Sequence, residues 1–389
     1  MSIKENSSSG FVDRLEALRG VASLWVAVFH SMLWLSIGSE SAIWAKPIWQ
    51  IEGLQAHVAR VLITFFNGAA AVDIFFVLSG FVLARSLTTV RLSLDSYARF
   101  VVKRLFRVAP AFWLSLAIVV CYLVSLFPGH SAIPGATGWF INWYKEPLTL
   151  AVILKNAVFV SPTLNPNAWT LKVEILASAL LPLIVWSLGQ RSVLRNALIL
   201  FAALSIAWFF RAYPAGVAHY SYMFVVGAIV SQQGQRSRAG IASHPVFVVG
   251  CIALVLTANA CFPLVHQLSQ DILTVAGAGG LIWSIASGAN NPLLSILDTR
   301  WARFLGRISY SFYLLHFIVL YAVSNFLLHA LPTDLLTRWP LPVMAFGCVL
   351  SIGIAVPISA VTFDLIEKPF TLLGRRIAQN RGGLIRAER

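Results

Sequence analysis

The chain has 389 residues, of which 58% are hydrophobic and only 11% are charged, and its formal net charge is +14. Soluble domains carry about 25% charged residues, so the composition excludes an ordinary soluble protein and indicates a membrane protein. The positive charge would suit nucleic acid, but its distribution along the chain favours membrane topology and contact with anionic membrane lipids. We therefore expect no nucleic-acid partner.

Ten apolar runs are long enough, or nearly so, to cross ~30 Å of hydrocarbon as helices. We predict an all-α polytopic membrane protein of about ten transmembrane helices, without a cleavable signal peptide. A shorter apolar stretch at 148–160 is expected to be re-entrant or interfacial. The ten runs lie at 18–37, 65–86, 108–128, 170–188, 196–212, 217–231, 245–263, 272–286, 311–329 and 341–366.

Lysine and arginine are distributed unevenly between the two alternating sets of connections. The set that includes both ends of the chain holds 22 of the 29 basic residues, and the other set holds the remaining seven. The positive-inside rule then places both termini in the cytoplasm, as an even number of spans requires. We expect a membrane domain at 13–371 between cytoplasmic tails at 1–12 and 372–389, in a bacterial cytoplasmic (inner) membrane.

The first apolar run follows Arg19 and contains His30. Eleven steps of about 100° end only ~20° beyond three full turns, so a helix places both residues on one stripe, ~16.5 Å apart along the axis. The arginine suits a phosphate at the membrane edge, and the imidazole can exchange a proton near neutral pH. An interhelical hydrogen bond of His30 and simple membrane anchoring by Arg19 are the structural alternatives.

Other ionisable residues also fall at membrane depth, where they are costly and face the protein interior or a wet cavity. VDIFFVLSGF (72–81) places Asp73 in the second run, NAWTLKVEI (167–175) brings Glu174 into the fourth, and LGRISYSFYLLHF (305–317) contributes His316. A carboxylate such as Glu174 can orient an imidazole or bind an acceptor hydroxyl.

The segment FVVKRLFRVAP (100–110) presents Arg104 and Arg107 three residues apart, on one face of an amphipathic helix at the cytoplasmic surface. This pattern fits a helix lying on the membrane or a second phosphate clamp. On the other side, the connections 38–64 and 129–169 are rich in tryptophan. These residues form either an aromatic belt at the interface or stacking platforms for a sugar.

Together these motifs resemble acyltransferase family 3, over nearly the whole chain from residue 13 to residue 370. Each motif is weak alone, but six in the same order are specific. They are Arg19 and His30 with ten residues between them, DIFFVLSGF, F-x-x-x-R-x-x-R-V-x-P at 100–110, W-T-L-x-V-E at 169–174, G-R-I-S-Y-S-F-Y-L-x-H at 306–316, and the final I-E-K-P.

The resemblance implies an integral membrane protein that moves an acyl group from cytoplasmic acyl-CoA, most often acetyl-CoA, to a hydroxyl of a sugar or lipid-linked glycan outside the cytoplasm. The family's essential arginine and histidine fall on Arg19 and His30. We assign Arg19, Arg104 and Arg107 to the coenzyme A phosphates, and we expect no metal. His30 would act as a general base on the acceptor hydroxyl or carry the acyl group itself.

We further assign Asp73 and Glu174 to the catalytic group, where they would set the imidazole tautomer or bind the acceptor, and Trp169, Thr170 and His316 to acceptor binding. The family's W-S-L-x-V-E-E-Q-F reads WTLKVEILA here, with Thr170 in place of serine. Isoleucine replaces the second acidic residue, which argues against a role that requires paired carboxylates.

A transporter or flippase is the alternative from a different class, since ten helices with buried charges could also line a substrate path. No pair of Gly/Pro-broken spans recurs in matching halves, as an inverted-repeat transporter would show. A purely structural scaffold leaves the aligned Arg19 and His30 unexplained. Thioester hydrolysis or acyl transfer by the purified protein would separate the enzyme from the transporter.

Overall fold

The computed structural model describes most of the chain and shows a helical protein. Its described residues are 3–37, 43, 46–87, 93–129, 135–188, 192–211, 216–234, 240–258, 260–262, 268–288 and 291–387. Within them, one isolated bridge between Leu35 and Ala136 is the β-type pairing, and all longer elements are helices. The prediction of an all-α fold is confirmed for this part of the chain.

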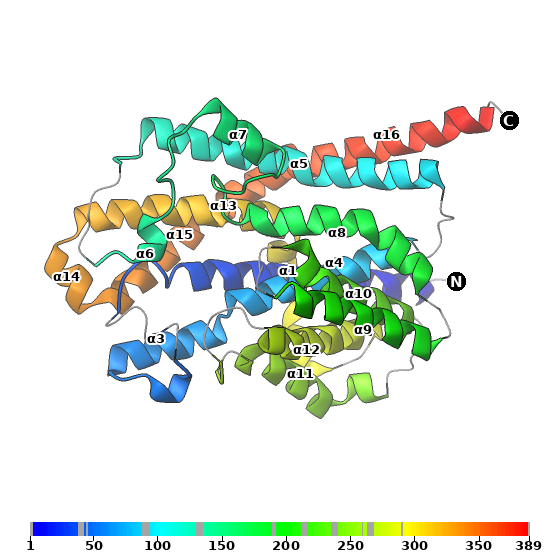
Figure 1. Ribbon diagram of the computed structural model, residues 1–389, viewed down its shortest axis with the longest axis horizontal. Helices are drawn as coiled ribbons and strands as arrows, with labels where there is room; N and C mark the ends of the chain where they lie inside the picture. The colour runs from blue at the N-terminus through cyan, green and yellow to red at the C-terminus, as the bar shows by residue number, and fades with distance from the viewer. Residues whose placement is uncertain are drawn as a thin grey trace.

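The helices carry the labels of Figure 1, and four short helical segments (η1, η2, η3 and η4) connect some of them. The main elements are α1 (Ile3–His30), α3 (Leu54–Phe65), α4 (Gly68–Leu87), α5 (Leu94–Ser125), α6 (Gly138–Ile141), α7 (Leu150–Ala157), α8 (Ala168–Ser187), α9 (Val193–Phe209), α10 (Val217–Gly234), α11 (Pro245–Thr257), α12 (Leu268–Ala286), α13 (Arg300–Ala330), α14 (Thr333–Arg338), α15 (Pro340–Thr362) and α16 (Lys368–Ala387). The connecting segments are η1 (Ile48–Gln50), η2 (Ile241–Ser243), η3 (Pro292–Asp298) and η4 (Phe363–Glu367).

Each of the ten predicted runs falls largely within a helix, and the short run at 148–160 contains α7. In the described residues, five helical stretches are long and apolar enough to cross a membrane, namely Leu54–Leu87, Leu94–Ser125, Ala168–Ser187, Arg300–Ala330 and Pro340–Gln379. Others are shorter than the ~20 residues that a span requires, such as α9 with 17 residues and α11 with 13. The helix positions are thus confirmed, while ten crossings stay a prediction.

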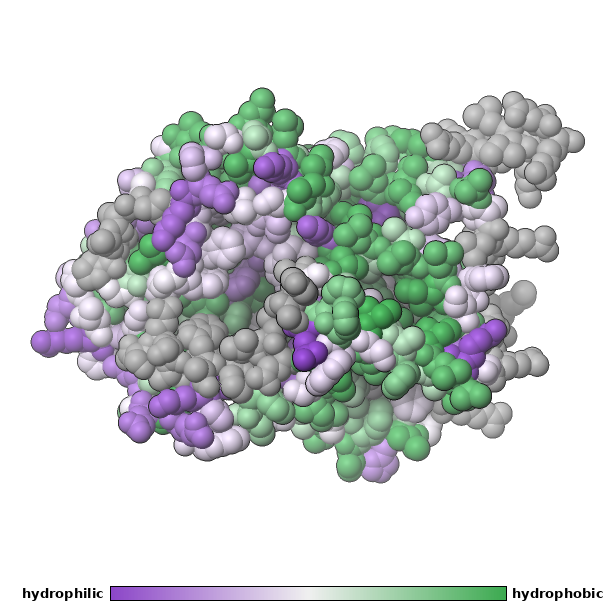
Figure 2. Space-filling view, in the orientation of Figure 1, coloured by the Kyte–Doolittle hydropathy of each residue, from purple (hydrophilic) through white to green (hydrophobic). Residues whose placement is uncertain are grey.

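Most of the long helices lie side by side along the longest axis of the molecule (Figure 1). The chain enters α1 and leaves α16 at the same end of this bundle, and α3, α6 and α14 lie toward the opposite end. Hydrophobic residues cover much of the surface shown in Figure 2, whereas hydrophilic residues gather toward the end that carries α14. Which end faces the cytoplasm stays a prediction from the charge distribution.

Burial distinguishes the central helices from the peripheral ones. The most apolar window of α13 is 78% buried, whereas that of the α15–α16 stretch is 28% buried. One core lies between α1, α4, α8, α10 and α12, and a second lies between α5, α13 and α15. Because α1 and α13 contact each other along the boundary of these cores, side chains from both halves can meet there.

The contact between α1 and α13 depends on two glycines. A Cβ atom on Gly20 would lie 2.4 Å from the backbone nitrogen of Gly306, and one on Gly306 would lie 2.6 Å from the backbone of Glu16. Only glycine allows the two backbones to approach this closely. The G-R-I-S motif therefore begins with the residue that sets the distance between the helices.

Candidate active site

Helix α1 places the predicted arginine and histidine against one partner helix, α13. Gly20 lies opposite Gly306, and ten residues further along each helix the imidazole of His30 lies against that of His316. At the start of this contact, the Nε atom of Arg19 donates a hydrogen bond of 2.8 Å to Ser309 Oγ. Both residues of the predicted stripe thus face α13, and the two helices run parallel in constant register.

Hydrogen bonds determine which nitrogen of His30 carries the proton. His316 Nδ1 lies 3.1 Å from the carbonyl oxygen of Phe312, which can only accept, so this nitrogen is protonated. His316 Nε2 is then an acceptor, and Asn167 Nδ2 approaches it at 3.5 Å. His30 Nδ1 lies 3.1 Å from the same nitrogen and must donate to it. The neutral His30 consequently keeps its lone pair on Nε2.

His30 is the last residue of α1, whereas the sequence predicted that the helix would continue to residue 37. The chain turns after it, and Thr137 holds the returning segment by donating from its Oγ1 to the Leu33 carbonyl oxygen at 2.5 Å. The residue as a whole is partly exposed, and aromatic rings surround its imidazole. His30 thus lies at the end of a helix, beside the turn that follows it.

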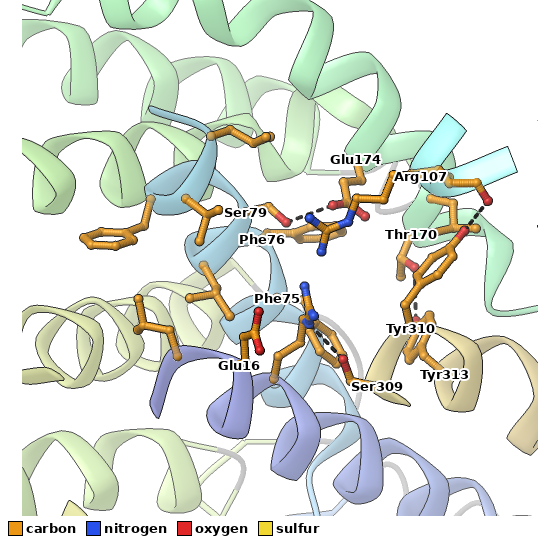
Figure 3. Close-up of a pocket in the computed structure, with 18 of the residues that line it drawn as sticks. Glu16, Phe75, Phe76, Ser79, Arg107, Thr170, Glu174, Ser309, Tyr310 and Tyr313 are labelled. Atoms are coloured by element: carbon orange, nitrogen blue, oxygen red, sulfur yellow. Dashed lines mark hydrogen bonds between the residues drawn. The ribbon is translucent and has the colours of Figure 1, made fainter. Parts of the chain in front are cut away.

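A cavity of about 210 Å³ opens between α1, α4, α5, α8 and α13 (Figure 3). Arg107 and Glu174 lie at one side of it, and Glu16 and Ser309 lie at the other. Four arginines and two glutamates line the cavity, so its charge favours an anionic ligand. These charged residues are Arg19, Arg85, Arg104, Arg107, Glu16 and Glu174.

Glu174 is paired with an arginine and makes no hydrogen bond to His30 among the described contacts. Its carboxylate forms an ion pair with Arg104 and accepts a hydrogen bond of 3.0 Å from Ser79 Oγ. Arg107 lines the same cavity without a carboxylate within 4.0 Å in the described part of the chain. The structure therefore leaves Arg107 more available than Arg104 to bind a ligand.

Arg104 and Arg107 belong to one continuous helix, α5, that begins at Leu94 with a capping box on Ser93. Residues 100–110 are part of α5, which continues from this segment into the apolar run, and their position relative to the membrane surface stays a prediction. The same geometry supports the other reading, since both arginines line the cavity.

Two hydroxyl groups form the inner wall of the cavity. Thr170 Oγ1 lies 3.1 Å from the hydroxyl of Tyr313, and Thr170 itself donates to the Asn167 carbonyl oxygen at 2.8 Å. The ring of Tyr313 also contacts His316, with 5.8 Å between ring centroids. Tyr313 thus separates the arginine-lined cavity from the histidine pair and touches both.

Asp73 and Trp169 lie away from both places. Asp73 is 1% exposed and belongs to a second buried group with Asp271, whose carboxylate is 3.0 Å from His219 Nε2. Trp169 contacts the rings of Phe76 and Tyr220 rather than the cavity. The structure therefore brings together Arg19, Arg104, Arg107, Thr170 and Glu174 at the cavity and His30 with His316 beside it, but not Asp73 or Trp169.

Sequence reasoning missed Ser309, Tyr313 and Asn167. The spacing of Ser309, Tyr313 and His316 is i, i+4, i+7, which is the signature of one helix face. This periodicity inside the G-R-I-S-Y-S-F-Y-L-x-H motif would have identified the face, although not its partners. Among the residues that the structure describes, no three His, Cys, Asp or Glu side chains cluster as metal ligands.

Comparison with known proteins agrees with these motifs. The family model of the acyltransferase domain matches residues 12–360. The chain belongs to acyltransferase family 3. This acyltransferase is also 28% identical over 341 residues to the exopolysaccharide production protein ExoZ of Rhizobium meliloti (strain 1021), an alignment that covers 80% of this chain and 92% of that protein. No solved structure matches the acyltransferase.

Proposed function

We propose that this acyltransferase moves an acyl group, typically acetyl, from cytoplasmic acyl-CoA to a hydroxyl of a polysaccharide or lipid-linked glycan outside the cytoplasm. The family supports the acyl transfer, and the similarity to a protein of exopolysaccharide production supports a glycan acceptor. The observation that carries the proposal is the pairing of His30 with His316 beside an arginine-lined cavity.

The cavity is the donor site of this proposal. It lies near the end of the bundle where α1 begins, which the charge distribution predicts to be cytoplasmic. Coenzyme A is anionic, and Arg19 and Arg107 offer planar donor groups that suit its phosphates. Arg104 contributes charge but is held by Glu174, so its part is mainly to shape the site.

His30 is the base of this proposal. Its Nε2 lone pair accepts the proton of the acceptor hydroxyl while that oxygen forms a bond to the thioester carbonyl carbon. The carbon–sulfur bond then breaks, and the departing thiolate takes the proton from His30. The hydrogen bond to His316 keeps Nδ1 protonated throughout, so that Nε2 is the nitrogen that exchanges the proton.

In this proposal Tyr313 moves during the reaction. Tyr313 lines the cavity, is hydrogen-bonded to Thr170 and contacts His316. An acyl chain that enters past Arg19 would pass Tyr313 to reach the histidine pair. The ~16.5 Å between Arg19 and His30 along α1 is a span that an extended pantetheine arm can bridge.

The test uses the purified protein in lipid nanodiscs with radiolabelled acetyl-CoA. We expect the wild type to release labelled acetate or to transfer it to added glycan, and His30→Gln to lose at least about 10²-fold in rate, since general-base help is worth roughly 10²–10⁴. His57→Gln on exposed α3 is the matched control and should keep full rate.

Two results would contradict the proposal. Full activity of His30→Gln would mean that the imidazole serves only as an interhelical hydrogen bond between α1 and α13. Movement of intact labelled substrate across sealed vesicles without thioester cleavage would instead support the transporter or flippase.

A further inference from the structure

The segment from Gly135 to Tyr144 is held against the turn that follows His30. Ser36 donates its N–H to the carbonyl oxygen of Gly135 at 2.8 Å, and Thr137 donates its N–H to that of Trp34 at 3.1 Å. Farther along, the ring of Phe140 stacks on Tyr321 with centroids 4.5 Å apart. These contacts fix α6 beside the end of α1, at the end of the bundle opposite the chain termini (Figure 1).

This attachment places Trp139 against His30 and Trp143 next to Trp139. The ring centroid of Trp139 lies 5.7 Å from that of His30 at an interplanar angle of 31°, and 5.7 Å from that of Phe317. Trp143 packs edge-on against both Trp139 and Phe317. An interfacial belt points its rings toward lipid headgroups, whereas Trp139 contacts the histidine and Trp143 packs against Trp139.

The same group retains unused binding capacity. The indole N–H of Trp143 is buried and has no acceptor among the described atoms. Trp139 and His30 are both partly exposed, so a ligand can reach them. In addition, Tyr144 has a positive φ of 61°, a strained conformation for a residue other than glycine, and such strain concentrates at functional sites.

We propose that Trp139 and Trp143 form the subsite that holds a sugar ring of the acceptor. The face of a pyranose carries C–H groups that suit the electron-rich face of the Trp139 indole. The N–H of Trp143 would donate to a ring or hydroxyl oxygen of the same sugar. A neighbouring hydroxyl then lies against His30 Nε2, the nitrogen that has the lone pair.

This subsite rests on the proposed function for its role in catalysis, but it can be tested without any reaction. Saturation-transfer NMR on the protein in nanodiscs, with methyl β-D-glucopyranoside, methyl β-D-galactopyranoside and methyl α-D-mannopyranoside as probes, reports direct contact between a sugar and the protein. Glycerol serves as a polyol without a ring face. We expect saturation transfer to at least one pyranoside and none to glycerol.

Variants then locate the contact. Trp139→Leu should abolish the pyranoside signal, and Trp139→Phe should retain it. Trp143→Phe should weaken binding at least threefold, because the N–H donor is lost while an aromatic ring remains at this position. Trp49→Leu is the matched control, since Trp49 is 63% exposed and lies on η1 away from His30. Thermal unfolding of each variant identifies any that fail to fold. If Trp139→Leu does not fold, Trp139→Phe and Trp143→Phe still test the subsite, because they keep an aromatic ring in the cluster.

The outcomes separate the subsite from the reaction. An unchanged pyranoside signal in Trp139→Leu, or no signal with any pyranoside in the wild type, overturns the subsite. If the pyranoside signal depends on Trp139 while the wild type neither cleaves nor transfers from acetyl-CoA, the subsite stands and the proposed acyl transfer fails.

Discussion

Replacing Gly306 with alanine should separate the two helices that hold the site. The new methyl group would lie 2.6 Å from the backbone of Glu16, whereas ordinary contacts begin at 3.4 Å. The atoms that the methyl group would meet belong to the backbone of Glu16 and Ala17, so no flexible side chain can move aside. We therefore expect α1 to shift by about 0.8 Å, the difference between these two distances. If that separation reached the histidine pair, its 3.1 Å hydrogen bond would lengthen to about 3.9 Å and be lost.

We expect Gly306→Ala to be less stable than the wild type by about 1–3 kcal/mol, the usual cost of overpacking. It should also lose most of its acetyl-CoA turnover, because His30 would no longer be held in one tautomer. Gly353→Ala is the control, since no atom lies within 4 Å of a Cβ at that position. Alanine there should be neutral or stabilising by about 0.5–1 kcal/mol.

The assay combines thermal unfolding in nanodiscs with acetyl-CoA hydrolysis and adds Gly20→Ala and the double variant. Gly20 meets Gly306 at the same crossing, so the two changes should be less than additive once the helices have moved apart. A Gly306→Ala protein with the melting temperature and turnover of the wild type would refute the reasoning. Strict additivity would show that the two glycines act independently.

Three further predictions concern charged residues. Arg19→Ala should weaken acyl-CoA binding about tenfold or more, since a charge-assisted hydrogen bond is worth ~1.5–3 kcal/mol, and Arg19→Lys should restore only part; equal affinities by titration calorimetry would remove the phosphate role. Glu174→Gln should lower the melting temperature, and adding Arg104→Gln should recover some of the loss, because one buried charge without its partner is worse than neither; a further drop would contradict this. The hydrogen bond from Arg14 lowers the pKa of the Asp298 carboxyl, so its stabilisation is fully present above the unfolded pKa of about 3.9 and is lost as the pH falls through the lower folded pKa. The difference in melting temperature between wild type and Asp298→Asn should therefore shrink below about pH 4, and a difference that stays constant would argue against the ion pair.

Local periodicity was enough to predict the helices and the stripe that carries Arg19 and His30. Apolar runs mark the helices because each helix places a continuous stretch of apolar side chains against lipid or against the protein core. The 100° step per residue aligns Arg19 with His30. The partner helix was not predictable in this way, since nothing local to α1 specifies that Ser309 and His316 will face it. The close crossing at Gly20 and Gly306 is a tertiary feature.

The position of Asp73 shows the same limit from the other direction. The residues of α4 that line the cavity include Phe75 and Ser79, four apart on one face. Phe76 also lines the cavity, and Asp73 lies one turn before it, so helical geometry alone does not separate Asp73 from the cavity. The burial of Asp73 beside Asp271 of α12 is a tertiary feature that the sequence of α4 does not reveal.

The wall formed by Tyr313 and Thr170 has a consequence for the membrane itself. In the proposed function, the protein binds acyl-CoA at one end of the bundle and a glycan at the other. An open channel between the two sites would let protons and ions leak across the membrane. Thr170 and Tyr313 line the cavity and are joined by a hydrogen bond, and Tyr313 contacts His316 on its other side. Within the described residues, the lining of the cavity therefore stops at this pair and does not include the two histidines. In the proposed reaction, only the acyl group, and not the coenzyme that delivers it, would pass this wall.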